Sequence, residues 1–239
     1  MKRPFHFRQF SMMHHQATMK VGTDAVLLGV WADIEADKLI LDAGTGSGIL
    51  ALMAAQRNPV ATIHAIDVDE KSVSEAAENF ARSPWSERLV AIQADLRTYM
   101  MGQGETYDHI LTNPPFFDKH IRTNDPRRNL ARHADNLSHD DLLIACQRLL
   151  KPDGRLSIVL PWTTGKQLAE AAPAFGLWPA GIQHIIPVSG REPNRMNLQL
   201  RKSEGNSLQE HYFVIRDTAL DFTPTYYQVL KEFYLGFAE

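Results

Sequence analysis

The feature that most constrains this chain is a glycine-rich turn that follows a short apolar run. The run 39–41 ends in Asp42, and three glycines follow within a few residues: Gly44, Gly46 and Gly48. Glycine adopts dihedrals that other residues avoid and lets a ligand approach the backbone. Because residues 49–57 have a helix-like apolar pattern, we predict a strand, a tight turn and a helix. Amide groups at the start of that helix would then face a ligand over the turn.

A second acid favours a nucleotide-like ligand. The apolar run 63–66 ends in Asp67, about twenty residues beyond the turn, where a carboxylate in a nucleotide-binding α/β fold accepts hydrogen bonds from ribose hydroxyls. The dinucleotide spacing G-x-G-x-x-G would need glycine at position 49, but the chain has Ile49. The alternative is an ordinary glycine-rich turn without a ligand.

Alternating strand-like and helix-like runs predict an α/β fold with a mostly parallel sheet and right-handed crossovers. The strand-like runs are 39–43, 62–67, 89–94, 107–112, 154–160, 180–188, 195–201 and 211–216, and the helix-like runs are 47–57, 70–82, 138–150 and 163–175. We expect about seven strands, with helices on both faces. The polar turn 203–207 would join the last two strands as an antiparallel hairpin.

Composition narrows the class of protein. The chain has 239 residues, 44% of them apolar, with 25 basic against 28 acidic residues, so net charge does not indicate a polyanionic partner. Its single cysteine, Cys146, lies in a helix-like apolar pattern and excludes an intrachain disulfide, which favours a reducing cytosol. No apolar stretch is long enough to span a membrane, and the N-terminus lacks a secretory signal. The adjacent pair His14 and His15 makes a poor metal site, so we expect no metal.

Acids and an amide follow the later strands. Asp95 comes just after the third strand-like run, where its carboxylate would accept a hydrogen bond from an adenine amino group, unless it only caps a helix or lies in an exposed loop. The fourth run ends in Asn113, Pro114, Pro115 and Phe116. The two prolines fix the backbone, so the Asn113 side-chain oxygen and the Pro114 carbonyl would form a rigid pair of acceptors for one NH₂ group, with the Phe116 ring stacked on the base that carries it.

The turn D-x-G-x-G-x-G at 42–48 resembles the first motif of class I S-adenosylmethionine-dependent methyltransferases. The segment M-K-V-G-T-D-A-V-L-L-G-x-W-A at 19–32, together with a phenylalanine-rich N-terminal arm, resembles a narrower group over essentially the whole chain. This group is the tRNA adenine-N6 methyltransferase family that modifies adenine 37 of valine tRNA. That family usually has tyrosine where this chain has Phe116, a ring that can still stack.

The resemblance implies one Rossmann-like methyltransferase domain over 1–239. Its parts would be an arm and cofactor-covering segment at 1–35, a cofactor-binding core at 36–162, and C-terminal strands and a helix at 163–239. The cofactor would be S-adenosylmethionine, with Lys20, Thr23 and Asp24 assigned to it by resemblance alone; Thr23 or Asp24 would also cap a short helix. The full set of expected cofactor-binding residues is Lys20, Thr23, Asp24, Asp42, Gly44, Gly46, Gly48, Asp67, Asp95, Leu96 and Asn113.

The segment after Phe116 favours RNA as the substrate. Residues 119–133 hold five lysine or arginine residues against one acid: Lys119, Arg122, Arg127, Arg128 and Arg132. Such a loop would neutralise phosphates beside a base turned into the site, although charged runs are usually only solvated surface. A second mixed patch contains Arg191, Arg195, Arg201 and Lys202.

We therefore expect a cytoplasmic enzyme that methylates adenine N6 in tRNA and needs no obligate protein partner. N-P-P-F names the atom type and not the substrate, so guanine N2 of rRNA and a protein glutamine remain alternatives. A nucleotide-binding regulator without catalysis is a further alternative.

Overall fold

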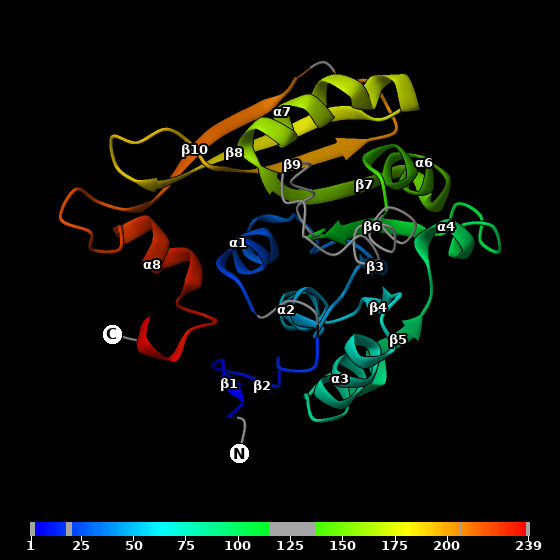
Figure 1. The fold of residues 1–239 in the computed structure, drawn as a ribbon, viewed down its shortest axis with the longest axis horizontal. Helices are drawn as coiled ribbons and strands as arrows, with labels where there is room; N and C mark the ends of the chain where they lie inside the picture. The colour runs from blue at the N-terminus through cyan, green and yellow to red at the C-terminus, as the bar shows by residue number, and fades with distance from the viewer. Residues whose placement is uncertain (1–2, 18–20, 115–136, 206, 238–239) are drawn as a thin grey trace, which may run out of the picture.

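An eight-stranded sheet forms the centre of the protein (Figure 1), seen in a computed structural model that describes residues 3–17, 21–114, 137–205 and 207–237. The strands are β3 (Leu39–Ala43), β4 (Thr62–Asp67), β5 (Leu89–Gln93), β6 (Tyr107–Thr112), β7 (Leu150–Pro161), β8 (Trp178–Val188), β9 (Arg195–Arg201) and β10 (Gln209–Arg216). Their order across the sheet is β10-β8-β9-β7-β6-β3-β4-β5. Neighbours among β3 to β7 are all parallel, which confirms the predicted mostly parallel α/β sheet.

Helices connect these strands and cover both faces of the sheet. The helices are α1 (Thr23–Trp31), α2 (Ile49–Arg57), α3 (Glu70–Ala81), α4 (Leu96–Tyr99), α6 (His139–Leu149), α7 (Trp162–Ala171) and α8 (Pro224–Leu230), with short 3-10 turns at Ser86–Arg88, Ala172–Phe175 and Leu235–Phe237. Among the described residues, no helix combines the length and apolar character needed to cross a bilayer.

The predicted hairpin at 203–207 is wrong. β9 is antiparallel to both β7 and β8, so both of its edges are already hydrogen-bonded. After the turn, the chain therefore passes to the outer edge of β8, where β10 pairs in parallel. The antiparallel hairpin at this end of the sheet is instead formed by β8 and β9. The periodicity of a strand predicts which of its faces are buried, but it does not predict the strand with which it pairs.

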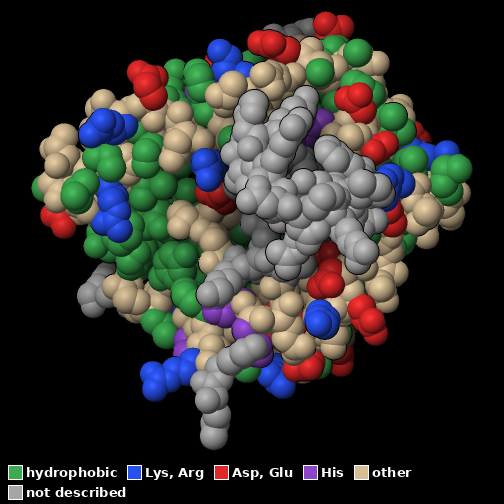
Figure 2. Space-filling view, in the orientation of Figure 1, with side chains coloured by type: hydrophobic (Ala, Val, Ile, Leu, Met, Phe, Trp, Pro, Cys, Tyr) green, Lys and Arg blue, Asp and Glu red, His purple; other side chains and the backbone are tan. Residues whose placement is uncertain are grey.

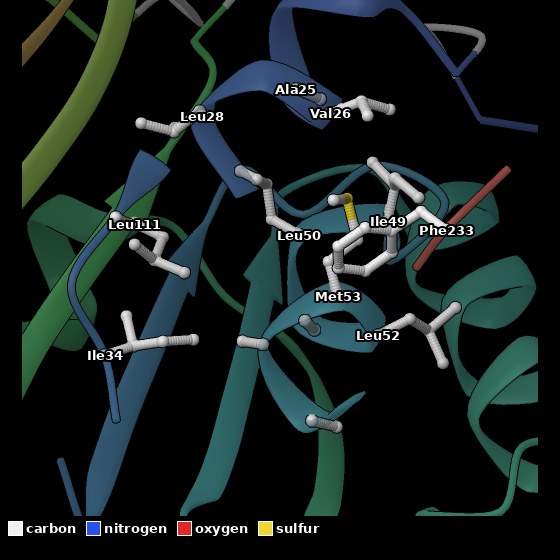
Figure 3. Close-up of a cluster of buried hydrophobic side chains, with 14 of the residues drawn as sticks. Ala25, Val26, Leu28, Ile34, Ile49, Leu50, Leu52, Met53, Leu111 and Phe233 are labelled. Atoms are coloured by element: carbon white, nitrogen blue, oxygen red, sulfur yellow. The ribbon is translucent and has the colours of Figure 1, made fainter. Parts of the chain in front are cut away.

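The buried side chains divide into two cores, one on each face of the sheet. Along β3, Ile40 belongs to the core beneath α1 and α2, whereas the next residue, Leu41, belongs to the core beneath α6 and α7. This alternation is the period of two that a strand covered on both faces requires. Figure 3 shows Leu28 of α1 and Met53 of α2 within the first core.

The N-terminal arm packs against the far end of the chain. Strands β1 (Phe5–His6) and β2 (Ser11–Met12) form a small antiparallel pair. Phe7 pairs with Tyr234 in an isolated bridge, and their rings stack with centroids 5.7 Å apart. The arm therefore joins the C-terminal segment to the first core.

The start of α1 differs from the prediction. The N-cap residue is Gly22, which has no side chain, so neither Thr23 nor Asp24 caps the helix. Thr23 is exposed as the first helical residue. The Asp24 carboxylate instead accepts a hydrogen bond from Nε of Arg195, 2.8 Å away, which ties α1 to β9.

Candidate active site

Four polar residues at or just after the ends of separate strands lie along one edge of the sheet. Within the strand pairing, Asp42 is level with Leu111, two residues before Asn113. In the same way Asp67 is level with Gln93, two residues before Asp95. Because parallel strands end at the same edge, the structure places the four along that edge, in the strand order β6-β3-β4-β5. They are Asp42, Asp67, Asp95 and Asn113.

The glycine turn is held rigidly by its own backbone. The amides of Gly44 and Thr45 both donate to the carbonyl of Ile66 at 2.9 Å. The Gly46 amide donates to Asp67 Oδ2 and the Gly48 amide to the Thr45 carbonyl, each at 2.9 Å. These four amides therefore have partners within the protein. The prediction that amides at the start of α2 face a ligand concerns residues after this turn; of these, the Ala51 amide donates to Asp42 Oδ2 at 3.2 Å.

Glycine is required at these three positions for different physical reasons. All three have positive φ, a conformation that favours glycine. A Cβ on Gly44 or Gly46 would meet no atom of the described residues within 4 Å, so space lies open over this part of the turn. A Cβ on Gly48 would lie 2.5 Å from Cε1 of Phe80, so this glycine is needed for the close packing of α3. The turn thus combines an approachable surface with a packed end.

Asp42 supports the turn from below. Its side chain is fully buried, and Oδ2 accepts hydrogen bonds from the Thr45 hydroxyl at 2.6 Å and the Ala51 amide at 3.2 Å. Burial raises the pKa of Asp42 to about 7; the two hydrogen bonds oppose the rise and the nearby charge of Asp67 adds to it. Oδ1 is buried without a hydrogen-bond partner among the described residues.

Asp67 joins β4 to the turn. Oδ2 accepts from the Gly46 amide at 2.9 Å and Oδ1 from the Asp69 amide at 3.0 Å. Burial raises the pKa of Asp67, and these backbone amides oppose the rise. Each carboxylate oxygen keeps a second lone pair, so the contact with ribose hydroxyls stays a prediction.

Asp95 is the N-cap of α4, the alternative that we gave for it. Its side chain accepts from the Arg97 amide at 2.8 Å and forms an ion pair with the Arg97 guanidinium. The hydrogen bond from that guanidinium lowers the pKa of Asp95. An adenine contact for Asp95 stays a prediction, and it would share the carboxylate with Arg97. The Leu96 side chain is buried in the core beneath α6 and α7.

Asn113 stands beside the glycine turn with a free acceptor. The hydroxyl of the preceding residue, Thr112, donates to the carbonyl of Ala43 at 2.7 Å, which fixes the tip of β6 next to Gly44. Oδ1 of Asn113 is buried without a hydrogen-bond partner among the described residues. Pro114 is buried next to it. A buried acceptor without a partner is costly, so this oxygen is suited to a ligand NH group.

Several predicted residues lie outside the described residues. These are Lys20, Pro115, Phe116, Lys119, Arg122, Arg127, Arg128 and Arg132. In the described part of the surface, Figure 2 shows Lys and Arg side chains interspersed with Asp and Glu, while hydrophobic side chains gather at the left, over α8 and the neighbouring ends of β8 and β10. Over the described ranges, no group of three or more His, Cys, Asp or Glu is arranged to hold a metal ion.

Sequence reasoning missed three residues whose side chains hold the glycine turn or the N-terminal arm in place. Thr45 bonds Asp42, and the side chains of Glu75 and Asn79 reach from α3 to the N-terminal arm. The signal for the last two was present, since two polar residues four positions apart stand on the buried face of α3 beside Ala76 and Phe80.

Comparisons with known proteins agree with this geometry. The family model described as "Methyltransferase small domain" matches residues 6–169. The chain is 37% identical over 231 residues to the tRNA1(Val) (adenine(37)-N6)-methyltransferase of Parabacteroides distasonis, covering 97% of each chain. It is 38% identical over 232 residues to the enzyme of the same name from Aeromonas hydrophila, again covering 97% of each.

Solved structures show the same fold at lower identity. A protein from Agrobacterium tumefaciens described as a predicted O-methyltransferase matches with a TM-score of 0.68 and 18% identity, covering 88% of this chain and 96% of that one. A SAM-dependent methyltransferase from the same species matches with a TM-score of 0.56 and 17% identity, covering 84% of this chain and 70% of that one. The family model and the near full-length relatives together place the chain in the methyltransferase small-domain family, among the tRNA1(Val) (adenine(37)-N6)-methyltransferases.

Proposed function

We propose that this enzyme transfers a methyl group from S-adenosylmethionine to N6 of adenine 37 in tRNA1(Val). The observation that carries the proposal is the buried Oδ1 of Asn113, which has no hydrogen-bond partner among the described residues. It is fixed beside a glycine turn where no described atom lies within 4 Å of a Cβ built on Gly44 or Gly46. The names of the near full-length relatives favour this substrate over guanine N2 or a protein glutamine.

The residues at the sheet edge fit S-adenosylmethionine. When bound, this cofactor supplies a methyl group activated by a sulfonium centre. No described atom lies within 4 Å of a Cβ built on Gly44 or Gly46, and a real side chain there would obstruct the cofactor. Oδ1 of Asp42 is a second buried acceptor without a partner among the described residues. Asp67, whose two oxygens already orient the turn, would accept hydrogen bonds from the ribose hydroxyls.

Asn113 has the central role in the proposed chemistry. The exocyclic N6 of adenine carries two hydrogens and a delocalised lone pair. Oδ1 of Asn113 would accept one hydrogen and the Pro114 carbonyl the other, which draws the nitrogen toward tetrahedral geometry. As the new N–C bond forms, the bond between the methyl carbon and the sulfonium sulfur would break, and the sulfur would leave as a neutral thioether. Positive charge would develop on N6, and these two fixed dipoles would stabilise it before one proton leaves to solvent. No side chain with a tuned pKa is required.

The target base would be held by residues beyond the described part of the chain. In the proposal Phe116 stacks on the adenine, following the rigid Pro115, and Lys20 borders the cofactor. The basic run containing Lys119, Arg122, Arg127, Arg128 and Arg132 would contact the phosphates that flank the base. Such an enzyme would act in the cytoplasm, where tRNA is its partner.

One experiment tests the activity and the target together. The protein is incubated with methyl-labelled S-adenosylmethionine and total tRNA from a strain that lacks the gene, and the labelled nucleosides are identified by mass spectrometry. We expect label in N6-methyladenosine within the anticodon-loop fragment of tRNA1(Val). Asn113→Ala serves as the matched catalytic control. Label in guanosine, or label that enters protein and not RNA, would refute the proposed substrate.

A further inference from the structure

Helix α3 holds the N-terminal arm through one buried carboxylate. The Glu75 side chain is buried, and its two oxygens accept hydrogen bonds from three successive arm amides. Oε1 accepts from His15 at 2.9 Å and Gln16 at 3.0 Å, and Oε2 accepts from Gln16 at 3.2 Å and Ala17 at 2.9 Å. Burial alone would raise the pKa of Glu75, but these amides outweigh it, so the net shift is downward and the carboxylate stays charged.

Asn79, one turn further along α3, joins the arm to the glycine turn. Its Oδ1 accepts from the Met13 amide at 2.8 Å, and its Nδ2 donates to the Met13 carbonyl at 2.8 Å. The same Nδ2 donates to the carbonyl of Ser47 at 2.9 Å. Ser47 lies between Gly46 and Gly48, so one amide side chain connects the arm directly to the turn over which the cofactor would lie.

The arm is also tied to the start of α1. Nδ1 of His14 accepts a hydrogen bond from the Val21 amide at 3.2 Å. Residue 21 stands immediately before Gly22 and Thr23, where α1 begins. Asn79 therefore links the glycine turn to the arm, Glu75 holds residues 15–17, and His14 links the arm to the residue that precedes α1.

Packing of the arm does not by itself explain this arrangement. The Phe7 and Phe10 rings already place the arm against the first core. A buried charge is costly and adds little stability unless it is fully hydrogen-bonded. Here the charge is directed at residues 15–17, which closely follow Met13, the arm residue that shares Asn79 with Ser47 of the turn.

We propose that Glu75 is a positioning residue of the cofactor site: together with Asn79 it holds residues 13–17 against the glycine turn, and this attachment strengthens the binding of S-adenosylmethionine. The inference rests on the proposed function only for the identity of the cofactor. Two linked sites influence each other reciprocally, so cofactor binding should in turn protect the arm. The arm therefore becomes part of the binding site through α3.

The test compares Glu75→Gln with Glu78→Gln. Glutamine keeps the size of Glu75 but removes its charge and turns an NH₂ group toward arm amides. Glu78 lies on the same helix, is exposed, and pairs with Arg82 one turn away, which makes it the matched control. Cofactor affinity is measured by calorimetry without RNA, and amide hydrogen exchange is followed in a peptide covering residues 11–17.

We expect Glu75→Gln to weaken the binding of S-adenosylmethionine by about tenfold or more, the usual size of a coupling between linked sites. Exchange of the 15–17 amides should become faster, and the protection that the cofactor adds to them in the wild type should be lost. With saturating cofactor, kcat should stay within about threefold of the wild type, so the defect appears in binding. Glu78→Gln should match the wild type throughout.

A second variant loosens the attachment from the other side. Gln16→Pro removes the central amide donor at an exposed position and leaves α3 unchanged, so it serves if Glu75→Gln folds poorly. Faster arm exchange with wild-type cofactor affinity in either variant would overturn the proposal and leave Glu75 a purely structural residue. If the wild type binds the cofactor but does not methylate tRNA, the proposed function fails while this inference stands.

Discussion

Two substitutions in the glycine turn test separately its packing against α3 and its access to a ligand. Gly44→Ala introduces a Cβ at φ +74 into open space, so its cost to folding is the left-handed backbone alone, about 1–2 kcal/mol. Gly48→Ala carries a similar backbone cost at φ +89, and its Cβ lies 2.5 Å from Cε1 of Phe80. That ring is buried in the first core and has little room to move. Overpacking of this kind adds about 1–3 kcal/mol.

The free energy of unfolding is therefore expected to fall by about 2–5 kcal/mol in Gly48→Ala and about 1–2 kcal/mol in Gly44→Ala. Urea denaturation followed by circular dichroism measures both. Gly104→Ala is the control, because that glycine has no positive φ and its Cβ would meet no described atom within 4 Å.

The two variants should also be compared in their affinity for the cofactor, where we expect the clear loss in Gly44→Ala. The folded fraction of Gly44→Ala should lose at least about tenfold in affinity for S-adenosylmethionine, because its Cβ occupies the approach to the turn. Gly104→Ala should retain wild-type affinity. If Gly48→Ala is as stable as Gly104→Ala, or if Gly44→Ala binds the cofactor normally, the assignment of these two glycines is refuted.

Three further predictions concern the acids and the amide of the site. Asn113→Ala should leave cofactor affinity nearly unchanged and slow methyl transfer by roughly a hundredfold or more; near-normal single-turnover rates would remove Asn113 from the chemistry. Asp67→Ala should weaken cofactor binding in calorimetry, and an unchanged Kd would exclude the ribose contact. Asp42→Asn should change the pH dependence of stability: since the folded pKa is about 7 against a usual 3.8, the folded wild type holds a proton that the unfolded chain releases, and its stability relative to the variant should fall by up to about 4 kcal/mol from pH 4 to pH 7. Urea midpoints at several pH values test this, and a constant difference between the two proteins would contradict it.

Local sequence patterns were sufficient to predict the strands in the parallel half of the sheet. The strands around Asp42, Asp67 and Asn113 lie at the predicted ranges because each apolar run is buried on both faces and is followed by its own polar residue. The common edge then follows from parallel pairing alone. For the same reason the turn could be located from its three glycines.

The features that could not be predicted from the sequence depend on residues far away in the chain. The position of β9 between β7 and β8 is decided by which edges are free, and no local pattern records that. The need for glycine at position 48 comes from Phe80, on another helix. Similarly, Glu75 shows its purpose only when the arm amides, some sixty residues earlier in the chain, are in place.

The position of β9 also decides how far a bound polynucleotide could extend along this protein. Arg195, at the start of β9, pairs with Pro161 at the end of β7 nearest Asn113, whereas Arg201, at the other end of β9, pairs with Arg155 in the interior of β7. Lys202, beyond it, is bound to Glu105 and the Leu150 carbonyl. The basic residues between 191 and 202 are thus split between the two ends of β9. In the described C-terminal half, the 189–194 connection lies at the same end of β9 as Arg195. The footprint on this half of a polynucleotide bound at the proposed target site should therefore be short.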